Sequence, residues 1–210
     1  MHGDVALKAV ELSYAFRGVD VLRGVSLEVD RGAFIAVTGP NGSGKTTFFR
    51  CLLGILNCRG EVAIEGRDPR READVKTLIG YIPQSLSYPP LTVREVVELH
   101  LRLYKSKIGA DEVLREFGLE QLQDRSVAKL SGGEKQRLAW ALAVSHSPRI
   151  LILDEPFSNL DAGWREKTRA LLGDFKGKST VLIAVHHLDE IKQYVDGVVE
   201  FEGGRIKGVW

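Results

Sequence analysis

Few features of the 210-residue chain point to a specialised class of protein. It contains two cysteines and one methionine, and its 29 basic side chains almost balance 28 acidic ones. This balance gives no field strong enough to make nucleic acid or an anionic membrane surface the main partner. The longest apolar runs, such as residues 181–185, are far shorter than the roughly 20 residues that span a bilayer. We therefore expect a globular protein that neither binds nucleic acid nor crosses a membrane by itself.

The scarcity of cysteine also bears on the cellular compartment. Cys51 and Cys58 are seven positions apart, a spacing that fits neither a redox C-x-x-C motif nor a pair of zinc ligands. We expect two free thiols that are at least partly buried. Asp4 and Lys8 interrupt what would be the apolar stretch of a secretion signal, so the chain is expected in the cytoplasm.

Strand-like and helix-like segments alternate along most of the chain. Strand patterns occupy residues 5–12, 21–29, 34–38, 61–64, 79–82, 150–153 and 181–185, and helix patterns occupy 44–53, 111–117, 164–172 and the residues after Ser131. This alternation predicts an α/β fold with a parallel sheet covered on both faces. Residues from Gln84 to about Leu130 are mostly helical, with Thr92 as an N-cap. We expect one domain over residues 1–210, with a helical subdomain at about 84–135 inserted in the α/β core.

A phosphate-binding loop connects a predicted strand to a predicted helix. Residues 39–46 fit the pattern G-x-x-x-x-G-K-[ST], in which glycines let backbone N–H groups converge on phosphate oxygens at a helix N-terminus. There Lys45 would reach the β- and γ-phosphates, and the Thr46 hydroxyl would bind Mg²⁺. The predicted nucleotide contacts are Gly39, Pro40, Asn41, Gly42, Ser43, Gly44, Lys45, Thr46 and Thr47.

Two adjacent carboxylates follow the apolar strand at 150–153. Because ligands in open α/β sheets lie beyond the carboxyl ends of the strands, we expect Asp154 to meet the magnesium ion. Glu155 could accept a proton from the attacking water. Adjacent acids after a strand are also common in solvated turns, and it is the phosphate loop that favours the catalytic interpretation.

Residues 131–134, S-G-G-E, show the capping-box pattern S-x-x-E that begins a helix. The cap alone does not explain Gly132 and Gly133. Glycines in a first turn disfavour the helix, but they leave its positive end open to close approach by an anion. The structural and functional interpretations are compatible, so Ser131, Gly132 and Gly133 are candidate nucleotide contacts.

The longer run L-S-G-G-E-K-Q-R at residues 130–137 resembles the signature of ATP-binding cassette (ABC) ATPases. The phosphate loop and Y-I-P-Q precede it, and I-L-I-L-D-E-P, S-N-L-D and a histidine after V-L-I-A-V follow it, in the family's order. The resemblance covers about residues 10–204. It implies a P-loop NTPase (RecA-like) fold with a parallel-sheet core, an N-terminal antiparallel β subdomain and an inserted α-helical subdomain.

The resemblance also implies roles for single residues. Gln84 of Y-I-P-Q would act at the catalytic site and on the metal, and Asp161 of S-N-L-D would contact nucleotide. His186 would be the switch histidine, with His187 as the alternative. Val185 and His187 depart from the threonine and aspartate that flank this histidine in the family pattern.

An aromatic residue near the N-terminus is expected to stack on adenine. Phe16 aligns with the family's stacking position, and Tyr14 is the alternative. Stacking needs only a π face, so phenylalanine should serve in place of the more usual tyrosine. Ordinary strand packing is the competing interpretation for both residues.

The implied function is that of the ATP-binding subunit of a transporter. It would bind ATP and Mg²⁺, pair head to tail with a second copy, and hydrolyse ATP to drive separate transmembrane permease subunits from the cytoplasmic face of the membrane. The main alternative is a soluble ABC ATPase, such as the iron–sulfur cluster assembly type, whose catalytic motifs would look the same. Residues 91–104 are similar to export ATPases of the ABC-2 type and residues 65–73 to metal-import ATPases, which leaves the direction of transport open.

Overall fold

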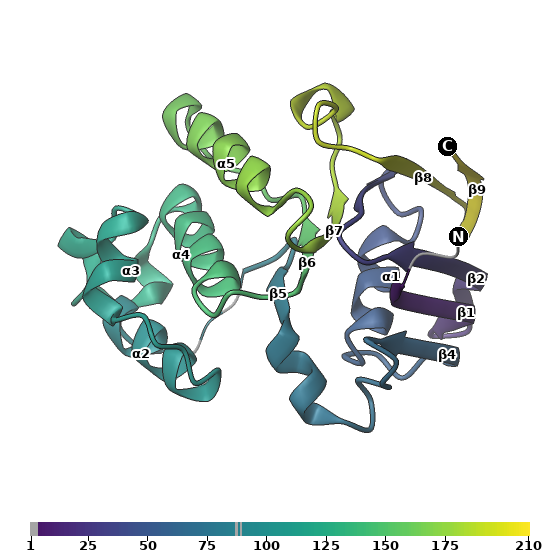
Figure 1. Cartoon of the computed structure of the whole chain (residues 1–210), viewed down its shortest axis with the longest axis horizontal. Coiled ribbons are helices and arrows are strands. Elements are labelled where there is room, and N and C mark those ends of the chain that lie inside the picture. Colours follow the sequence, from purple (N-terminus) through teal and green to yellow (C-terminus); the bar gives the residue numbers. More distant parts are fainter. Residues whose placement is uncertain (1–3, 87, 89) are drawn as a thin grey trace.

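A six-stranded sheet runs through the centre of the computed structural model, which describes residues 4–86, 88 and 90–210 (Figure 1). The strand order is β5-β6-β7-β3-β8-β9, and all neighbours are parallel except β8 and β9. This confirms the parallel sheet that the alternating pattern predicts, although the last two strands were not predicted. The strands are β3 (Phe34–Thr38), β5 (Ile79–Ile82), β6 (Ile150–Asp154), β7 (Thr180–Ala184), β8 (Gly197–Glu202) and β9 (Arg205–Val209).

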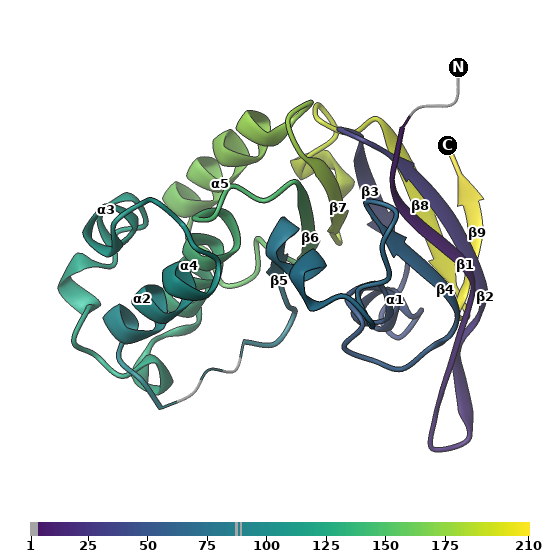
Figure 2. The same cartoon turned by 60° about the horizontal axis from the view of Figure 1, so that its bottom comes forward.

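A second sheet of three antiparallel strands lies on the far side of α1, in the order β2-β1-β4 (Figure 1). Its strands are β1 (Val5–Phe16), β2 (Val19–Asp30) and β4 (Arg59–Ile64). The hairpin of β1 and β2 is long, and its tip projects beyond the rest of the molecule (Figure 2). The sheet confirms the N-terminal antiparallel β subdomain that the resemblance implies.

Helices flank the central sheet. The helix α1 (Lys45–Leu52) follows the phosphate loop, and α5 (Ala162–Phe175) follows β6. Between β5 and β6 lie α2 (Val93–Leu103), α3 (Ala110–Glu116) and α4 (Gly132–Val144), a section in which residues 87 and 89 are outside the described residues. The short 3₁₀ helices are η1 (Ala73–Leu78), η2 (Glu120–Leu122), η3 (Val127–Lys129) and η4 (Leu188–Glu190). No helix in the described ranges has both the length and the apolar character needed to span a membrane.

Both faces of the central sheet are covered by hydrophobic core. Leu151 and Leu153 of β6 pack in the core formed with α2, α3, α4 and α5, whereas Ile150 and Ile152 pack in the core formed with α1 and the antiparallel sheet. All five residues of β6 are buried. Side chains on both faces of this strand therefore pack in a hydrophobic core, which explains why its sequence is continuously apolar and does not alternate with polar residues.

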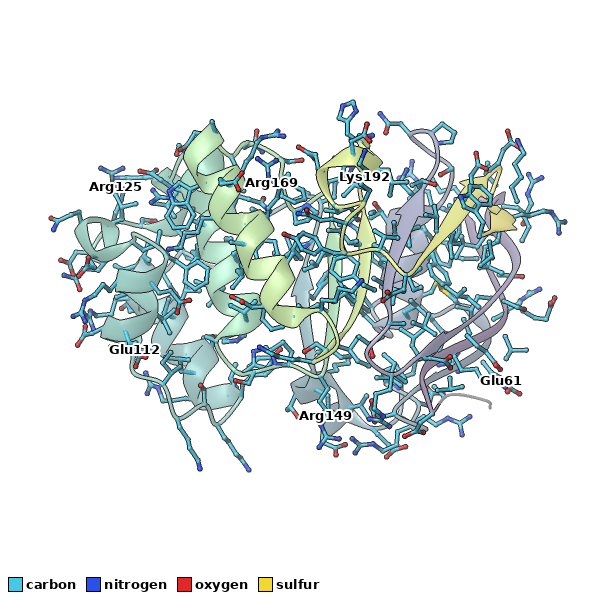
Figure 3. The ribbon with its side chains drawn as sticks, turned by 45° about the horizontal axis from the view of Figure 1, so that its top comes forward. Glu61, Glu112, Arg125, Arg149, Arg169 and Lys192 are labelled. Atoms are coloured by element: carbon cyan, nitrogen blue, oxygen red, sulfur yellow. A yellow bond between two sulfur atoms is a disulfide. The ribbon has the colours of Figure 1, made fainter. Side chains whose placement is uncertain are left out.

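Charged side chains of both signs are spread over the outer surface, as Glu112 on α3 and Arg169 on α5 illustrate (Figure 3). Many form ion pairs with neighbours in the sequence, such as Arg169 with Glu166 at 2.7 Å and Lys192 with Asp189 at 3.1 Å. Exposed pairs of this kind contribute little to the free energy of folding. Burial in the two cores therefore contributes far more to the free energy of folding than these exposed ion pairs do.

The two cysteines are joined, so the expectation of free thiols is wrong. Cys51 near the end of α1 forms a disulfide with Cys58 just before β4, and their Cα atoms are 5.7 Å apart. Both residues are buried, as expected. Rules on cysteine spacing describe short local motifs. Here the turn at 53–57 brings the chain back from the end of α1, so that the residue just before β4 lies beside it. Disulfides are rare in the cytosol of mesophiles but common inside hyperthermophiles.

Candidate active site

The phosphate loop lies between β3 and α1, in the strand, loop and helix order that the sequence predicts. Gly39 and Gly44 have φ values of 132° and 110°. A Cβ on Gly39 would lie 2.2 Å from the carbonyl oxygen of Phe201, so only glycine fits there. Lys45 Nζ donates to the carbonyl oxygens of Gly39 at 2.7 Å and Pro40 at 3.1 Å, which folds its side chain over the loop.

The ammonium group of Lys45 is poorly solvated. The residue is 7% exposed, and burial lowers its pKa, against the opposing effect of Glu155 and Asp154. An ammonium group has three donors, of which two are used by loop carbonyls among the described residues. An anion bound over the loop would favour the charged form of this lysine.

Three oxygen-bearing side chains meet where α1 begins and β6 ends. The Thr46 hydroxyl donates to Asp154 Oδ2 at 2.6 Å and lies 3.3 Å from Gln84 Oε1. Asp154 Oδ1 is buried and has no hydrogen-bond partner within the described ranges, and burial raises the pKa of this carboxyl group. A buried carboxylate oxygen without a partner is unfavourable unless a cation compensates it. Hydroxyl, amide and carboxylate oxygens are ligands for hard cations, so these residues fit Mg²⁺.

Glu155 is the centre of a second set of contacts. Its Oε1 accepts a hydrogen bond from Gln84 Nε2 at 3.0 Å and lies 3.0 Å from His186 Nε2. The backbone of Glu155 has a φ of 55°, and its N–H donates to Ala184 O at 3.0 Å. Non-glycine residues held in this left-handed region cluster at functional sites. Both candidate switch histidines are exposed, and the structure brings the imidazole of His186 to this carboxylate.

A hollow of about 210 Å³ lies over the loop and extends to Gln84 and Glu155. Its lining residues are Val21, Asn41, Gly42, Ser43, Gly44, Lys45, Thr46, Thr47, Gln84 and Glu155. Neither Phe16 nor Tyr14 lines it. Phe16 is 56% exposed at the end of β1, with the guanidinium carbon of Arg17 5.4 Å from its ring centroid. Tyr14 packs against the core beneath the antiparallel sheet.

The signature residues lie outside this hollow. The Ser131 hydroxyl accepts from Glu134 N at 3.3 Å, and Ser131 N donates to Glu134 Oε2 at 2.7 Å, which confirms the predicted capping box at the start of α4. A Cβ on Gly132 would lie 3.1 Å from the Asn159 side chain, and one on Gly133 would lie 2.9 Å from its carbonyl oxygen. The close passage of Asn159 therefore gives both glycines a structural reason that the S-x-x-E pattern does not reveal.

Other polar contacts around α4 and α5 were not predicted from the motifs. The Asp161 carboxylate caps α5 by accepting from Trp164 N at 2.9 Å. Gln136 Nε2 and Trp140 Nε1 both donate to Pro156 O, at 3.0 and 3.1 Å, and tie the signature helix to the chain just beyond β6. Gln136 could have indicated such a contact from the sequence, because a side-chain amide that is buried among apolar helix positions needs a hydrogen-bond partner.

Comparisons with known proteins agree with this geometry. The family model described as ABC transporter matches residues 22–158. The chain belongs to the ABC transporter family. Over 203 residues it is 34% identical to the tungstate uptake system ATP-binding protein TupC of Peptoclostridium acidaminophilum, covering 93% of this chain and 94% of that protein. It is 32% identical to the spermidine/putrescine import ATP-binding protein PotA of Spiroplasma citri, but it spans only 61% of the length of that protein.

Solved structures of the family show the same fold. An ATP-binding subunit of an ABC transporter superposes with a TM-score of 0.87 at 29% identity, covering 98% of this chain and 89% of that one. A dimeric ATP-binding cassette in a post-hydrolysis state, bound to ADP and Pi, has a TM-score of 0.84 at 25% identity, with 97% of each chain covered. The ABC protein described here is thus an ATP-binding subunit of a transporter and an ATPase, with the P-loop cassette fold that the sequence implied.

Proposed function

We propose that this subunit hydrolyses MgATP over its phosphate loop in a head-to-tail pair of copies and thereby drives transport through separate transmembrane subunits. The observation that carries the proposal is the contact of Glu155 with both Gln84 and His186 beside that loop. These contacts support a role for Glu155 as the proton acceptor, oriented by Gln84 and His186, beside the loop that would hold the γ-phosphate. We treat residues 1–210 as one cassette domain in which a helical subdomain at 84–135 carries the signature.

Nucleotide binding would begin at the loop. Backbone N–H groups at the start of α1 would meet the phosphates, and Lys45 Nζ would donate to the β- and γ-phosphates. Thr46, Gln84 and Asp154 would hold Mg²⁺, which neutralises negative charge on the β- and γ-phosphate oxygens when it is bound. The exposed ring of Phe16 offers a π face to the adenine.

The hydrolytic step would depend on Glu155. The attacking water forms a bond from its oxygen to the γ-phosphorus, the bond from that phosphorus to the ADP oxygen breaks, and Glu155 accepts a proton from the water. Gln84 and His186 both contact one oxygen of this carboxylate, Oε1, in the structure. A carboxylate that is already oriented loses less entropy in reaching the reactive geometry.

The second copy would complete the site. Ser131, Gly132 and Gly133 do not line the hollow of their own chain, although the N-terminus of α4 carries partial positive charge. In a head-to-tail pair, that helix end would face the γ-phosphate on the other copy. ATP would then stabilise the pair and hydrolysis would weaken it, because only the triphosphate offers the additional contact.

A Glu155→Gln variant tests this scheme. It should bind ATP but hydrolyse it very slowly, and light scattering after size exclusion should show a dimer with ATP and a monomer without it. The matched control is Glu155→Gln combined with Lys45→Ala, which should stay monomeric because it lacks the phosphate-binding lysine. A Glu155→Gln protein that binds a fluorescent ATP analogue and remains monomeric would refute the head-to-tail scheme.

The transmembrane partner would dock beside α2. Leu99 and Leu103 are exposed by 44% and 65% on this helix, and a hollow of about 220 Å³ is lined by Leu86, His100 and Tyr104 among others. Exposed apolar side chains next to a hollow are typical of protein contact sites. A cytoplasmic helix of the permease would cover them and hold the subunit at the cytoplasmic face of the membrane.

Co-purification from solubilised membranes tests the docking. The tagged protein should recover a multi-span partner that changes its ATPase rate, and Leu99→Asp with Leu103→Asp should lose the partner while retaining nucleotide binding. Recovery with soluble proteins only would favour the soluble ABC ATPase instead. The relatives named for uptake and import support uptake as the direction. Right-side-out vesicles that expel the solute on ATP hydrolysis would contradict that direction.

A further inference from the structure

The start of α2 is paired with the segment that leads to the signature. Residues 91–94 and 123–127, which we call the strap, are joined by three backbone hydrogen bonds of 2.9–3.1 Å and one antiparallel bridge. The first N–H groups of a helix have no partner inside it, and here two of them donate to the second segment. The bonds run from Val93 N to Arg125 O, from Arg94 N to Gln123 O and from Val127 N to Leu91 O, and the bridge joins Thr92 to Ser126.

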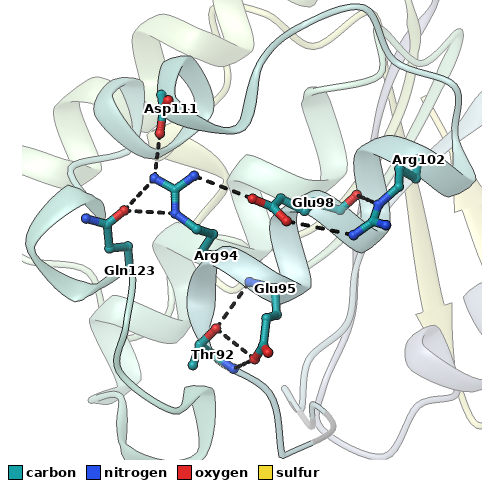
Figure 4. A network of polar contacts seen from close by, with 7 residues as sticks. All are labelled: Thr92, Arg94, Glu95, Glu98, Arg102, Asp111 and Gln123. Atoms are coloured by element: carbon teal, nitrogen blue, oxygen red, sulfur yellow. Dashed lines mark hydrogen bonds and ion pairs between the residues drawn. The ribbon is translucent and has the colours of Figure 1, made fainter.

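The side chain of Arg94 closes the strap. Its Nε donates to Gln123 Oε1 at 2.9 Å, and Nη2 donates to the same oxygen and to Asp111 Oδ1 (Figure 4). Its Nη1 lies 3.5 Å from Glu98 Oε1. One guanidinium group thus contacts α2, α3 and the second segment of the strap at once. A lysine could not do this, because its ammonium group lacks the planar fork of donors.

A further contact connects the strap to the helix cap. Arg125 Nη1 lies 3.6 Å from Glu134 Oε1. The other carboxylate oxygen of Glu134 accepts the N–H of Ser131, whose hydroxyl caps α4. A series of polar contacts therefore runs from the first turn of α2 to the N-terminus of the signature helix.

We propose that Arg94 is a positioning residue for the signature. It holds the segment before Ser131 against α2 and α3, so that the N-terminus of α4 is oriented for the nucleotide on the second copy. The inference rests on the head-to-tail pair proposed above. None of the groups that Arg94 contacts lines the hollow over the phosphate loop, so its loss should weaken pairing without weakening nucleotide binding to one copy.

The test compares two arginines of α2 in the Glu155→Gln background. Arg94→Met should raise the ATP concentration for half-maximal dimerisation by about tenfold, the change that the loss of one moderate interaction gives. The ATP concentration for half-maximal dimerisation of Arg94→Lys should lie between those of Arg94→Met and the parent. Arg102→Met is the matched control, because among the described residues Arg102 contacts Glu98 of the same helix, at 3.7 Å, and no residue of the strap. Gln123→Ala, which removes the strap acceptor and keeps Arg94, should shift dimerisation in the same direction.

Two readouts separate positioning from loss of fold. The affinity of each monomer for a fluorescent ATP analogue should stay at the parental value, whereas with Glu155 restored, the ATP concentration for half-maximal turnover should rise about tenfold, in parallel with dimerisation. If Arg94→Met and Arg102→Met dimerise alike, or if nucleotide affinity falls in parallel with dimerisation, the inference is overturned. If the Glu155→Gln parent itself does not dimerise, the head-to-tail scheme fails and the role of Arg94 fails with it.

Discussion

Reducing the Cys51–Cys58 disulfide should lower the free energy of unfolding by about 2.5 kcal/mol. The bond closes a loop of eight residues, from 51 to 58. For a loop of this length, the entropy removed from the unfolded chain corresponds to about 2.5 kcal/mol at 25 °C. For a chain of this size, each kcal/mol shifts the melting temperature by about 2–4 °C, so the expected decrease is about 5–10 °C.

The oxidised and reduced forms of one sequence can be compared directly. Because both cysteines are buried, the disulfide must be reduced in denaturant and the protein refolded with reductant present. Guanidinium unfolding of the two forms gives the free-energy difference, and alkylation followed by mass spectrometry counts the thiols. A Cys51→Ala, Cys58→Ala variant should be insensitive to reductant. The reasoning is refuted if both forms unfold at the same midpoint, or if freshly purified protein shows two free thiols in denaturant.

Two other predictions concern acid stability and the phosphate loop. Burial and the neighbouring His146 lower the pKa of His100 to about 4. The folded protein therefore favours neutral His100, and its full stability is present above the ordinary pKa of about 6.5. As the pH drops to 4, the free energy of unfolding should fall by up to about 3 kcal/mol. His100→Phe should flatten this decline in urea unfolding, and an unchanged slope would contradict the assignment. Gly39→Ala should abolish binding of a fluorescent ATP analogue, because its Cβ would meet Phe201 O at 2.2 Å. Gly66→Ala lies outside the phosphate loop and meets no atom, so it should keep binding, with a strain of about 1–2 kcal/mol. Equal loss of binding in both variants would be inconsistent with this reasoning.

The elements that the sequence predicts best are strands of the central sheet, whose side chains pack against hydrophobic core on both faces. The predicted ranges 34–38 and 79–82 agree with β3 and β5, and 150–153 is one residue short of β6. The final hairpin was missed because β8 and β9 lack strong periodicity. The turn between them carried a signal, since Gly203 and Gly204 both have positive φ, as tight hairpin turns require.

Features that depend on distant parts of the chain could not be read from local patterns. The spacing of Cys51 and Cys58 matches no short motif, yet the fold places their Cα atoms 5.7 Å apart. In the sequence, Gly132 and Gly133 suggest an opening for an anion. Only the structure shows that Asn159 passes close to both, with its carbonyl oxygen 2.9 Å from the position of a Cβ on Gly133. In both cases a partner contributed by another element, absent from the motif, supplies the explanation.

The strand order explains which part of the site the sequence could predict. Strands β5, β6, β7 and β3 are neighbours in the parallel sheet, so Gln84, Glu155, His186 and Gly39, which follow their carboxyl ends, must meet at one edge. Motifs that follow these strands are therefore brought together by the sheet itself. Ser131 follows no strand of this sheet and caps a helix outside the hollow. Under the head-to-tail scheme proposed above, the contacts to the γ-phosphate that the sheet edge does not provide would come from the signature of a second copy.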